Sequence, residues 1–157
     1  MTRTRIVLAT VAAFVVANVF AGTIHGFVLA GDYAPYEGTL LRSTDGPAWQ
    51  FIFLPVAHLS VVCGLMWIYT HARLPGSAGA QGLTLGLLAW IMGQVPVWLL
   101  WYAEQPWPGS LLMKQLGLEL LSSLVIGWTI AFTAGRSGSH EFVHEPYGGQ
   151  SSRVATQ

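Results

Sequence analysis

The sequence predicts an all-α membrane protein, a bundle of four transmembrane helices, on three observations. Only 9% of its 157 residues are charged and 53% are hydrophobic, whereas soluble domains carry about 25% charged residues. Four apolar stretches each reach the length of about 20 helical residues that crosses about 30 Å of hydrocarbon. Polar or Gly/Pro-rich segments separate these stretches. Most of the protein surface is therefore expected to face lipid.

We place the four spans at residues 6–30, 50–71, 82–102 and 111–134. The connections include "ARLPGSAGAQ" and "AEQPWPGS", both rich in helix-breaking residues. No alternation of polarity is long enough to predict a closed barrel of strands. Residues 1–134 then form one membrane domain, and residues 135–157 are predicted to be a disordered cytoplasmic tail, because Gly and Ser are frequent there.

The first span has two interpretations. It follows "MTRTR" and contains "VFAG", a pattern that could end a signal peptide at Ala21. Apolar residues continue past His25 to Ala30, however, and complete a full-length span. We expect an uncleaved anchor, with a cleaved signal peptide as the alternative.

The cations predict the orientation. Five fall on one side of the predicted bundle and two on the other, the five being Arg3, Arg5, Arg73, Arg136 and Arg153, and the two Arg42 and Lys114. The positive-inside rule then places both termini in the cytoplasm. Lys114 is interpreted as a snorkelling residue at the outer interface. Aromatic residues at the outer ends of the spans predict an interfacial belt, namely Trp49, Trp98, Trp101, Tyr102 and Trp107.

The tail contains a match to a zinc-peptidase motif. In "SHEFVHEP", His140, Glu141 and His144 have the H-E-x-x-H spacing that binds zinc from one helical face. Pro146 leaves room for barely two helical turns, and no His, Asp or Glu follows Glu145 to complete a site. We interpret the match as chance, with adventitious metal binding as the most that His140 and His144 would do.

Five polar side chains lie within the spans, and they are the candidate site: Asn18, His25, His58, Gln94 and Glu119. Ionisable groups in a span are costly, so they usually face the bundle interior. At 1.5 Å per residue, His58, Gln94 and Glu119 lie about 12–14 Å from the outer ends of their spans, with His25 about 8 Å and Asn18 about 18 Å deep. The four helices are thus predicted to contribute one polar layer to the outer half of the bundle.

Three roles remain open for this layer. Its hydrogen bonds could fix the helix packing. Alternatively, His25, His58 and Glu119 form a set suited to zinc, iron or copper, or His25 and His58 ligate the iron of haem. In the third role Glu119 and the histidines relay protons in a small channel or transporter. Packing with no cofactor is the expectation.

Glycine and proline mark further features of the spans. Gly22 with Gly26, and Gly82 with Gly86, have the small-xxx-small spacing that lets helices approach closely. These two faces predict a homo-oligomer or a larger membrane complex. Pro55 and Pro96 are expected to kink the second and third spans and to free backbone carbonyls toward the interior.

The layout resembles that of small four-helix bacterial inner-membrane proteins grouped as families of unknown function. The resemblance covers about residues 6–135 and is carried by "HGFVLAGDYAPYEG", "LLR", "WIYTHARLPG", "GLTLGLLAW" and "GWTIAFTAG". It implies a four-helix membrane bundle and supplies no catalytic residues.

The expected function is that of a non-enzymatic accessory or interaction protein in the lipid bilayer. A net charge of zero offers no basic surface for nucleic acid. The single cysteine, Cys63, provides neither a disulfide nor a cysteine-based zinc site. No grouping for nucleophilic catalysis stands out.

Overall fold

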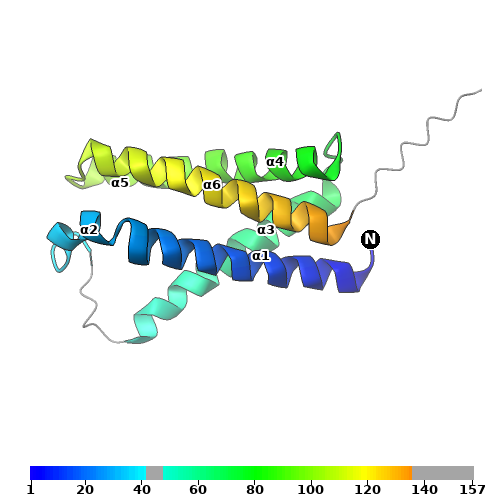
Figure 1. Ribbon diagram of the computed structural model, residues 1–157, viewed down its shortest axis with the longest axis horizontal. Helices are drawn as coiled ribbons and strands as arrows, with labels where there is room; N and C mark the ends of the chain where they lie inside the picture. The colour runs from blue at the N-terminus through cyan, green and yellow to red at the C-terminus, as the bar shows by residue number, and fades with distance from the viewer. Residues whose placement is uncertain (42–47, 136–157) are drawn as a thin grey trace, which may run out of the picture.

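The computed structural model describes residues 1–41 and 48–135, and every regular element in these ranges is a helix (Figure 1). Four helical rods are long and apolar enough to cross a membrane: Arg3–Val28, Phe53–His71, Ala78–Glu104 and Gly109–Ala134. They confirm the all-α class and the four predicted spans, whose ends shift by only a few residues. The zincin-like motif of the tail, with His140 and His144, lies outside the described residues.

The first rod contains an irregular turn near its end. α1 (Arg3–Thr23) continues into a π-helical turn, η1 (Ile24–Val28), and then into α2 (Ala30–Tyr33) and the 3-10 turn η2 (Ala34–Tyr36). The N–H of Leu29 donates to the Ile24 carbonyl over 2.8 Å, five residues back. Such a turn inserts one extra residue into the helix, and π turns of this kind are frequent at functional sites.

The second rod, α3 (Phe53–His71), follows the 3-10 turn η3 (Ala48–Ile52) and packs by its C-terminal half only. Its buried residues are Val62, Leu65, Met66 and Tyr69. The N-terminal half diverges from the other helices, as Figure 1 shows. Pro55, where a kink was predicted, lies in the first turn of α3, a position that proline tolerates.

The third rod is α4 (Ala78–Ala89), the π-helical turn η4 (Trp90–Gln94) and α5 (Val95–Glu104). A π turn therefore directly precedes the helix start at Pro96, where a kink was predicted. The N–H of Val95 closes this turn on the carbonyl of Trp90. The indole N–H of Trp90 donates to the Leu116 carbonyl over 2.9 Å and ties the turn to the fourth rod.

The fourth rod, α6 (Gly109–Ala134), has the largest number of buried residues of the helices described. It ends at Gly135, whose φ of 57° lies in the left-handed region that glycine adopts readily. The Arg5 guanidinium donates to the Gly135 carbonyl over 3.2 Å. This bond ties the start of α1 to the end of α6.

The closest helix contact joins α4 to α6 through three glycines. A Cβ added at Gly86 would lie 2.5 Å from the carbonyl oxygen of Ser123, and one added at Gly82 would lie 2.8 Å from the Cα of Trp128. Gly127 faces both glycines from α6. The Gly82–Gly86 face is thus occupied within the chain, while Gly22 and Gly26 have no neighbour within 4 Å of an added Cβ. Of the two predicted association faces, only that of Gly22 and Gly26 is open.

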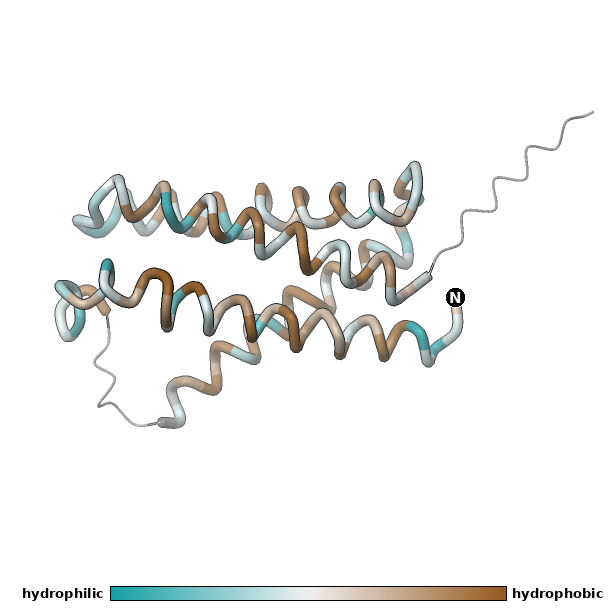
Figure 2. Tube along the Cα trace, viewed as in Figure 1, coloured by the Kyte–Doolittle hydropathy of each residue, from teal (hydrophilic) through white to brown (hydrophobic). Residues whose placement is uncertain are grey.

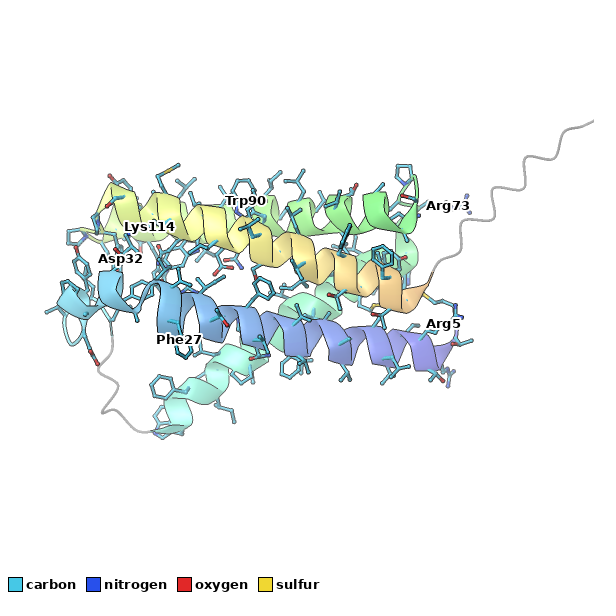
Figure 3. All side chains as sticks on the ribbon, viewed as in Figure 1. Arg5, Phe27, Asp32, Arg73, Trp90 and Lys114 are labelled. Carbon is cyan, nitrogen blue, oxygen red and sulfur yellow. The ribbon has the colours of Figure 1, made fainter. Side chains whose placement is uncertain are left out.

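The surface of the rods suits a multi-pass membrane protein. Hydrophobic residues cover the middle of the helices, and many hydrophilic ones gather toward their ends (Figure 2). Large apolar side chains are exposed, among them Phe27 at 82% and Met92 at 71%. Arg5 and Arg73 lie at one end of the bundle, whereas Asp32 and Lys114 lie at the other, here called the α2 end (Figure 3).

The α4–α6 contact predicts a specific loss of stability. Gly86→Ala should lower the free energy of unfolding by about 1–3 kcal/mol, because the new methyl group forces two backbones apart. Denaturation with SDS followed by circular dichroism measures this. Gly117→Ala is the control, since no heavy atom lies within 4 Å of a Cβ added there. Equal stability of the two variants would contradict the close contact.

Candidate functional site

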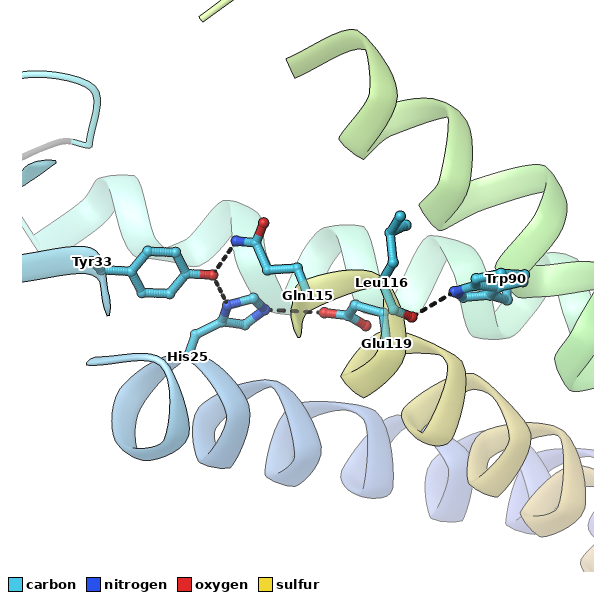
Figure 4. A network of polar contacts seen from close by, with 6 residues as sticks. All are labelled: His25, Tyr33, Trp90, Gln115, Leu116 and Glu119. Carbon is cyan, nitrogen blue, oxygen red and sulfur yellow. Dashed lines mark hydrogen bonds and ion pairs between the residues drawn. The ribbon is translucent and has the colours of Figure 1, made fainter. Parts of the chain in front are cut away.

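A chain of hydrogen bonds joins the end of the first rod to α6 (Figure 4). The Gln115 amide donates to the Tyr33 hydroxyl over 2.5 Å. That hydroxyl lies 2.7 Å from Nδ1 of His25, and Nε2 of His25 lies 3.1 Å from a carboxylate oxygen of Glu119. Gln115 and Glu119 are one turn apart on α6, while His25 lies in the π turn η1 and Tyr33 ends α2. Four residues from two rods thus form one network.

The hydrogens of this chain can take two arrangements, which differ in the tautomer of His25. An amide N–H only donates, so the Tyr33 oxygen accepts from Gln115. In one arrangement the Tyr33 O–H donates to Nδ1 of His25, and Nε2–H of His25 donates to the Glu119 carboxyl group. In the other arrangement the Glu119 acid group donates to Nε2, and Nδ1–H donates to the Tyr33 oxygen. The two hydrogen bonds of His25 then run in the opposite direction. Both arrangements satisfy both nitrogens of His25.

Tyr33 is held in its neutral form. Burial raises its pKa from 10.0 to about 12, and the negative charges of Glu119 and Asp32 act in the same direction, against the hydrogen bond from Gln115. The phenol therefore keeps its proton throughout the physiological range. Its ring stacks on the His25 ring with the centroids 5.8 Å apart.

A second polar pair lies next to this chain on α1 and α3. Nδ2 of Asn18 donates to the Phe14 carbonyl over 2.8 Å, which orients the amide. Its Oδ1 therefore faces Nδ1 of His58, 3.1 Å away. Because a carbonyl oxygen only accepts, Nδ1 of His58 carries a proton, and in neutral His58 the lone pair is on Nε2. Nε2 has no hydrogen-bond partner among the residues that the structure describes.

The structure brings together four of the five predicted residues, as two pairs. Gln94, the fifth, is half-buried in η4 and its side chain makes no hydrogen bond to another described residue. Two members of the network were not among the candidates, Tyr33 and Gln115. Gln115 shares the polar stripe of Glu119 on the fourth span, four residues away, and that spacing could have identified it.

The three predicted metal ligands do not converge on one point. Both ring nitrogens of His25 are occupied, by Tyr33 and Glu119, and His58 bonds Asn18 instead. Within residues 1–41 and 48–135, no group of three or more His, Cys, Asp or Glu could hold a metal ion. A metal or an axially bound haem would have to break the hydrogen bonds of His25 first.

A cavity of about 920 Å³ adjoins both pairs at the α2 end. Asn18, His25, His58, Tyr33 and Gln115 contribute to its lining, and the other walls are mostly apolar or aromatic. It lies between α1, the diverging half of α3, and α5. Gly22 and Gly26 line it too, and no heavy atom occupies the 4 Å around a Cβ built on either. The open glycine face thus belongs to the cavity.

One wall residue carries an unsatisfied polar atom. Trp98 lines the cavity, and its indole N–H is buried with no acceptor among the described residues. Buried polar groups nearly always have a partner, so such an exception calls for a physical explanation. The Trp98 ring also stacks on His25, with the ring centroids 6.5 Å apart. It therefore lies directly beside the hydrogen-bonded chain.

The segment that covers the α2 end is anchored to α6. Nζ of Lys114 donates to both carboxylate oxygens of Asp32, over 2.8 and 2.9 Å. Lys114, interpreted from the sequence as a snorkelling residue, also forms this exposed ion pair. Tyr36 packs on Trp107 with a centroid distance of 5.2 Å. These contacts hold Tyr33 against its partners.

Comparison of the chain with protein-family models, with curated proteins and with solved structures finds no match. The resemblance to small four-helix inner-membrane proteins therefore stays a prediction from layout. The candidate site is defined by its geometry alone.

The raised pKa of Tyr33 predicts a measurable titration. In spectrophotometric titration of the phenolate band, the difference between wild type and Tyr33→Phe should have its midpoint near pH 12 instead of 10. Because the folded state holds this proton more tightly, the contribution of Tyr33 to stability is present below pH 10 and is lost as pH rises toward 12. A midpoint near 10 would refute the buried, hydrogen-bonded phenol.

Proposed function

We propose that this protein is a non-enzymatic binding protein of the bacterial inner membrane, which holds an amphiphilic small molecule in the cavity at the α2 end. The observation that carries the proposal is the cavity of about 920 Å³ with several polar groups on one part of its wall. Ligand sites typically measure about 300–1,000 Å³ and combine apolar walls with a few polar groups that orient the ligand.

The lining includes residues of the exposed surface, which would face lipid in a membrane. Phe51 and Leu54 of the diverging α3 region line the cavity and are 44% and 58% exposed, and Trp101 of α5 is 41% exposed. A molecule with an alkyl chain can enter from the bilayer along such residues without crossing water. This supports a lipid-like ligand over a water-soluble one.

The orientation is part of the proposal. The positive-inside rule favours cytoplasmic termini, because Arg3, Arg5 and Arg73 belong to the same side of the chain. The α2 end would then face the periplasm and the cavity would lie in the outer half of the bilayer. The ligand is accordingly expected in the outer leaflet.

Association with a partner protein remains compatible with this proposal, but one glycine face is open for it instead of the two that the sequence predicts. The Gly22–Gly26 face is open, yet both glycines line the cavity. A helix packed there would compete with the ligand. We therefore propose the small molecule as the first occupant of this face.

Filling the cavity tests the binding function. Gly22→Leu should leave the fold intact, since an added Cβ at Gly22 has no neighbour within 4 Å. The new side chain occupies the cavity and should remove most of the ligand. Lipid extracts of the protein, purified in mild detergent from membranes, are compared by mass spectrometry, and a species enriched with wild type should be depleted at least about tenfold with the variant.

The matched control is Gly64→Leu. Gly64 lies on α3, also has no neighbour within 4 Å, and does not line the cavity. It should retain the ligand at the wild-type level. Equal lipid profiles for all three proteins would overturn the proposal.

The Tyr33–His25–Glu119 chain favours a second candidate, proton transfer through the α2 end. Its two proton arrangements are the states that a relay would exchange. In liposomes with an internal pH dye, Glu119→Gln would abolish proton flux if the chain conducts. Gln94→Leu is the control, since the Gln94 side chain lies outside the network. Flux no higher than in empty liposomes would exclude this candidate.

A further inference from the structure

Two polar atoms beside the cavity lack partners, and they are of opposite kind. Trp98 offers a buried N–H with no acceptor, and neutral His58 offers the lone pair of Nε2 with no donor. Both residues line the cavity. From these two atoms we infer that the ligand is an uncharged amphiphile with a hydroxyl head group. This inference rests on the proposed binding function and adds the ligand's chemistry.

The need for a donor follows from Asn18. Its amide is oriented by the Phe14 carbonyl, so its oxygen requires the proton on Nδ1 of His58. Nε2 is then an acceptor and needs an O–H or N–H from the ligand. A ketone, an ester or an ether has no such hydrogen.

The need for an acceptor follows from Trp98. An indole nitrogen is a donor only, and leaving it buried and unpaired is unfavourable. A hydroxyl group is the simplest group that both donates and accepts. It can donate its hydrogen to His58, and its oxygen can accept from Trp98 once the indole turns toward the cavity, because its N–H is enclosed in this structure.

The charges on the described residues around the cavity disfavour an anionic head group. Among the described residues that line it there is no Lys or Arg, and Glu37 is acidic. The nearby Lys114 is already paired with Asp32. A phosphate or carboxylate would enter an apolar site without a counter-ion, which is strongly unfavourable. A free fatty acid or a phospholipid therefore fits less well than a long-chain alcohol.

Three probes of equal chain length separate these chemistries. The protein in nanodiscs is incubated with tritiated hexadecanol, and binding is corrected for empty nanodiscs. Unlabelled hexadecanol, hexadecyl methyl ether and hexadecanoate are the competitors. Hexadecanol should compete up to about tenfold better than the methyl ether, since one hydrogen bond is worth up to about that factor. Hexadecanoate should compete no better than the ether.

Two variants locate the hydrogen bond. His58→Phe keeps a ring and removes Nε2, so it should reduce the preference for the alcohol over the ether to less than about twofold. His71→Phe is the matched control, because His71 is an exposed histidine at the far end of the same helix. It should keep the full preference. The comparison of alcohol with ether on the wild-type protein decides the question even if His58→Phe fails to fold.

The outcomes separate this inference from the function on which it rests. Equal competition by alcohol and ether, with binding lost in Gly22→Leu, would refute the hydroxyl head group and keep the binding function. Stronger competition by hexadecanoate would also refute it and would indicate a protonated His58. No saturable binding of hexadecanol would refute the inference, and an unchanged lipid profile in Gly22→Leu would additionally refute the function.

Discussion

Polar side chains within apolar helices must find hydrogen-bond partners inside the protein, since the bilayer core supplies none. This constraint organises the α2 end. His25 satisfies both ring nitrogens by joining Tyr33 to Glu119, and the Tyr33 side chain points from the end of α2 toward His25 (Figure 4). The Lys114–Asp32 ion pair holds the α2 segment on α6. The same constraint pairs His58 with Asn18 across α1 and α3. The cavity lies beside these two pairs.

α4 and α6 pack closely, whereas the N-terminal half of α3 packs loosely against its neighbours. This difference explains why a cavity exists. Glycines let α4 and α6 approach to backbone contact, so no space remains between them. α3 has no such face, and it is buried only from Val62 onward. Its N-terminal half therefore leaves a volume that Gly22 and Gly26 enlarge by their lack of side chains. Small residues thus close one interface and open another.

The four spans could be predicted because length and hydropathy determine them. The pairing of the polar residues could not, because depth along a helix says nothing about rotation. The π turns η1 and η4 each insert an extra residue, and nothing in the local sequence indicates an i→i−5 bond. Gln94, at the end of η4, accordingly lies outside the network that its depth predicted. Tyr33 was missed because it lies beyond the predicted span, and its side chain reaches the layer by pointing toward His25 and Gln115 (Figure 4).

In a network that served packing alone, every donor and acceptor would be expected to find a partner within the protein. The Gln115–Tyr33–His25–Glu119 chain does so, since the donors and acceptors along it can all be matched. The neighbouring cavity wall differs, because Trp98 keeps a buried, unused donor and His58 an unused acceptor, and both residues line the cavity. Leaving such groups unpaired costs stability in an apolar setting. A resident molecule that bonds both groups would recover that cost. The rigid chain would then serve to hold Trp98 and His25 in place as one face of a binding site.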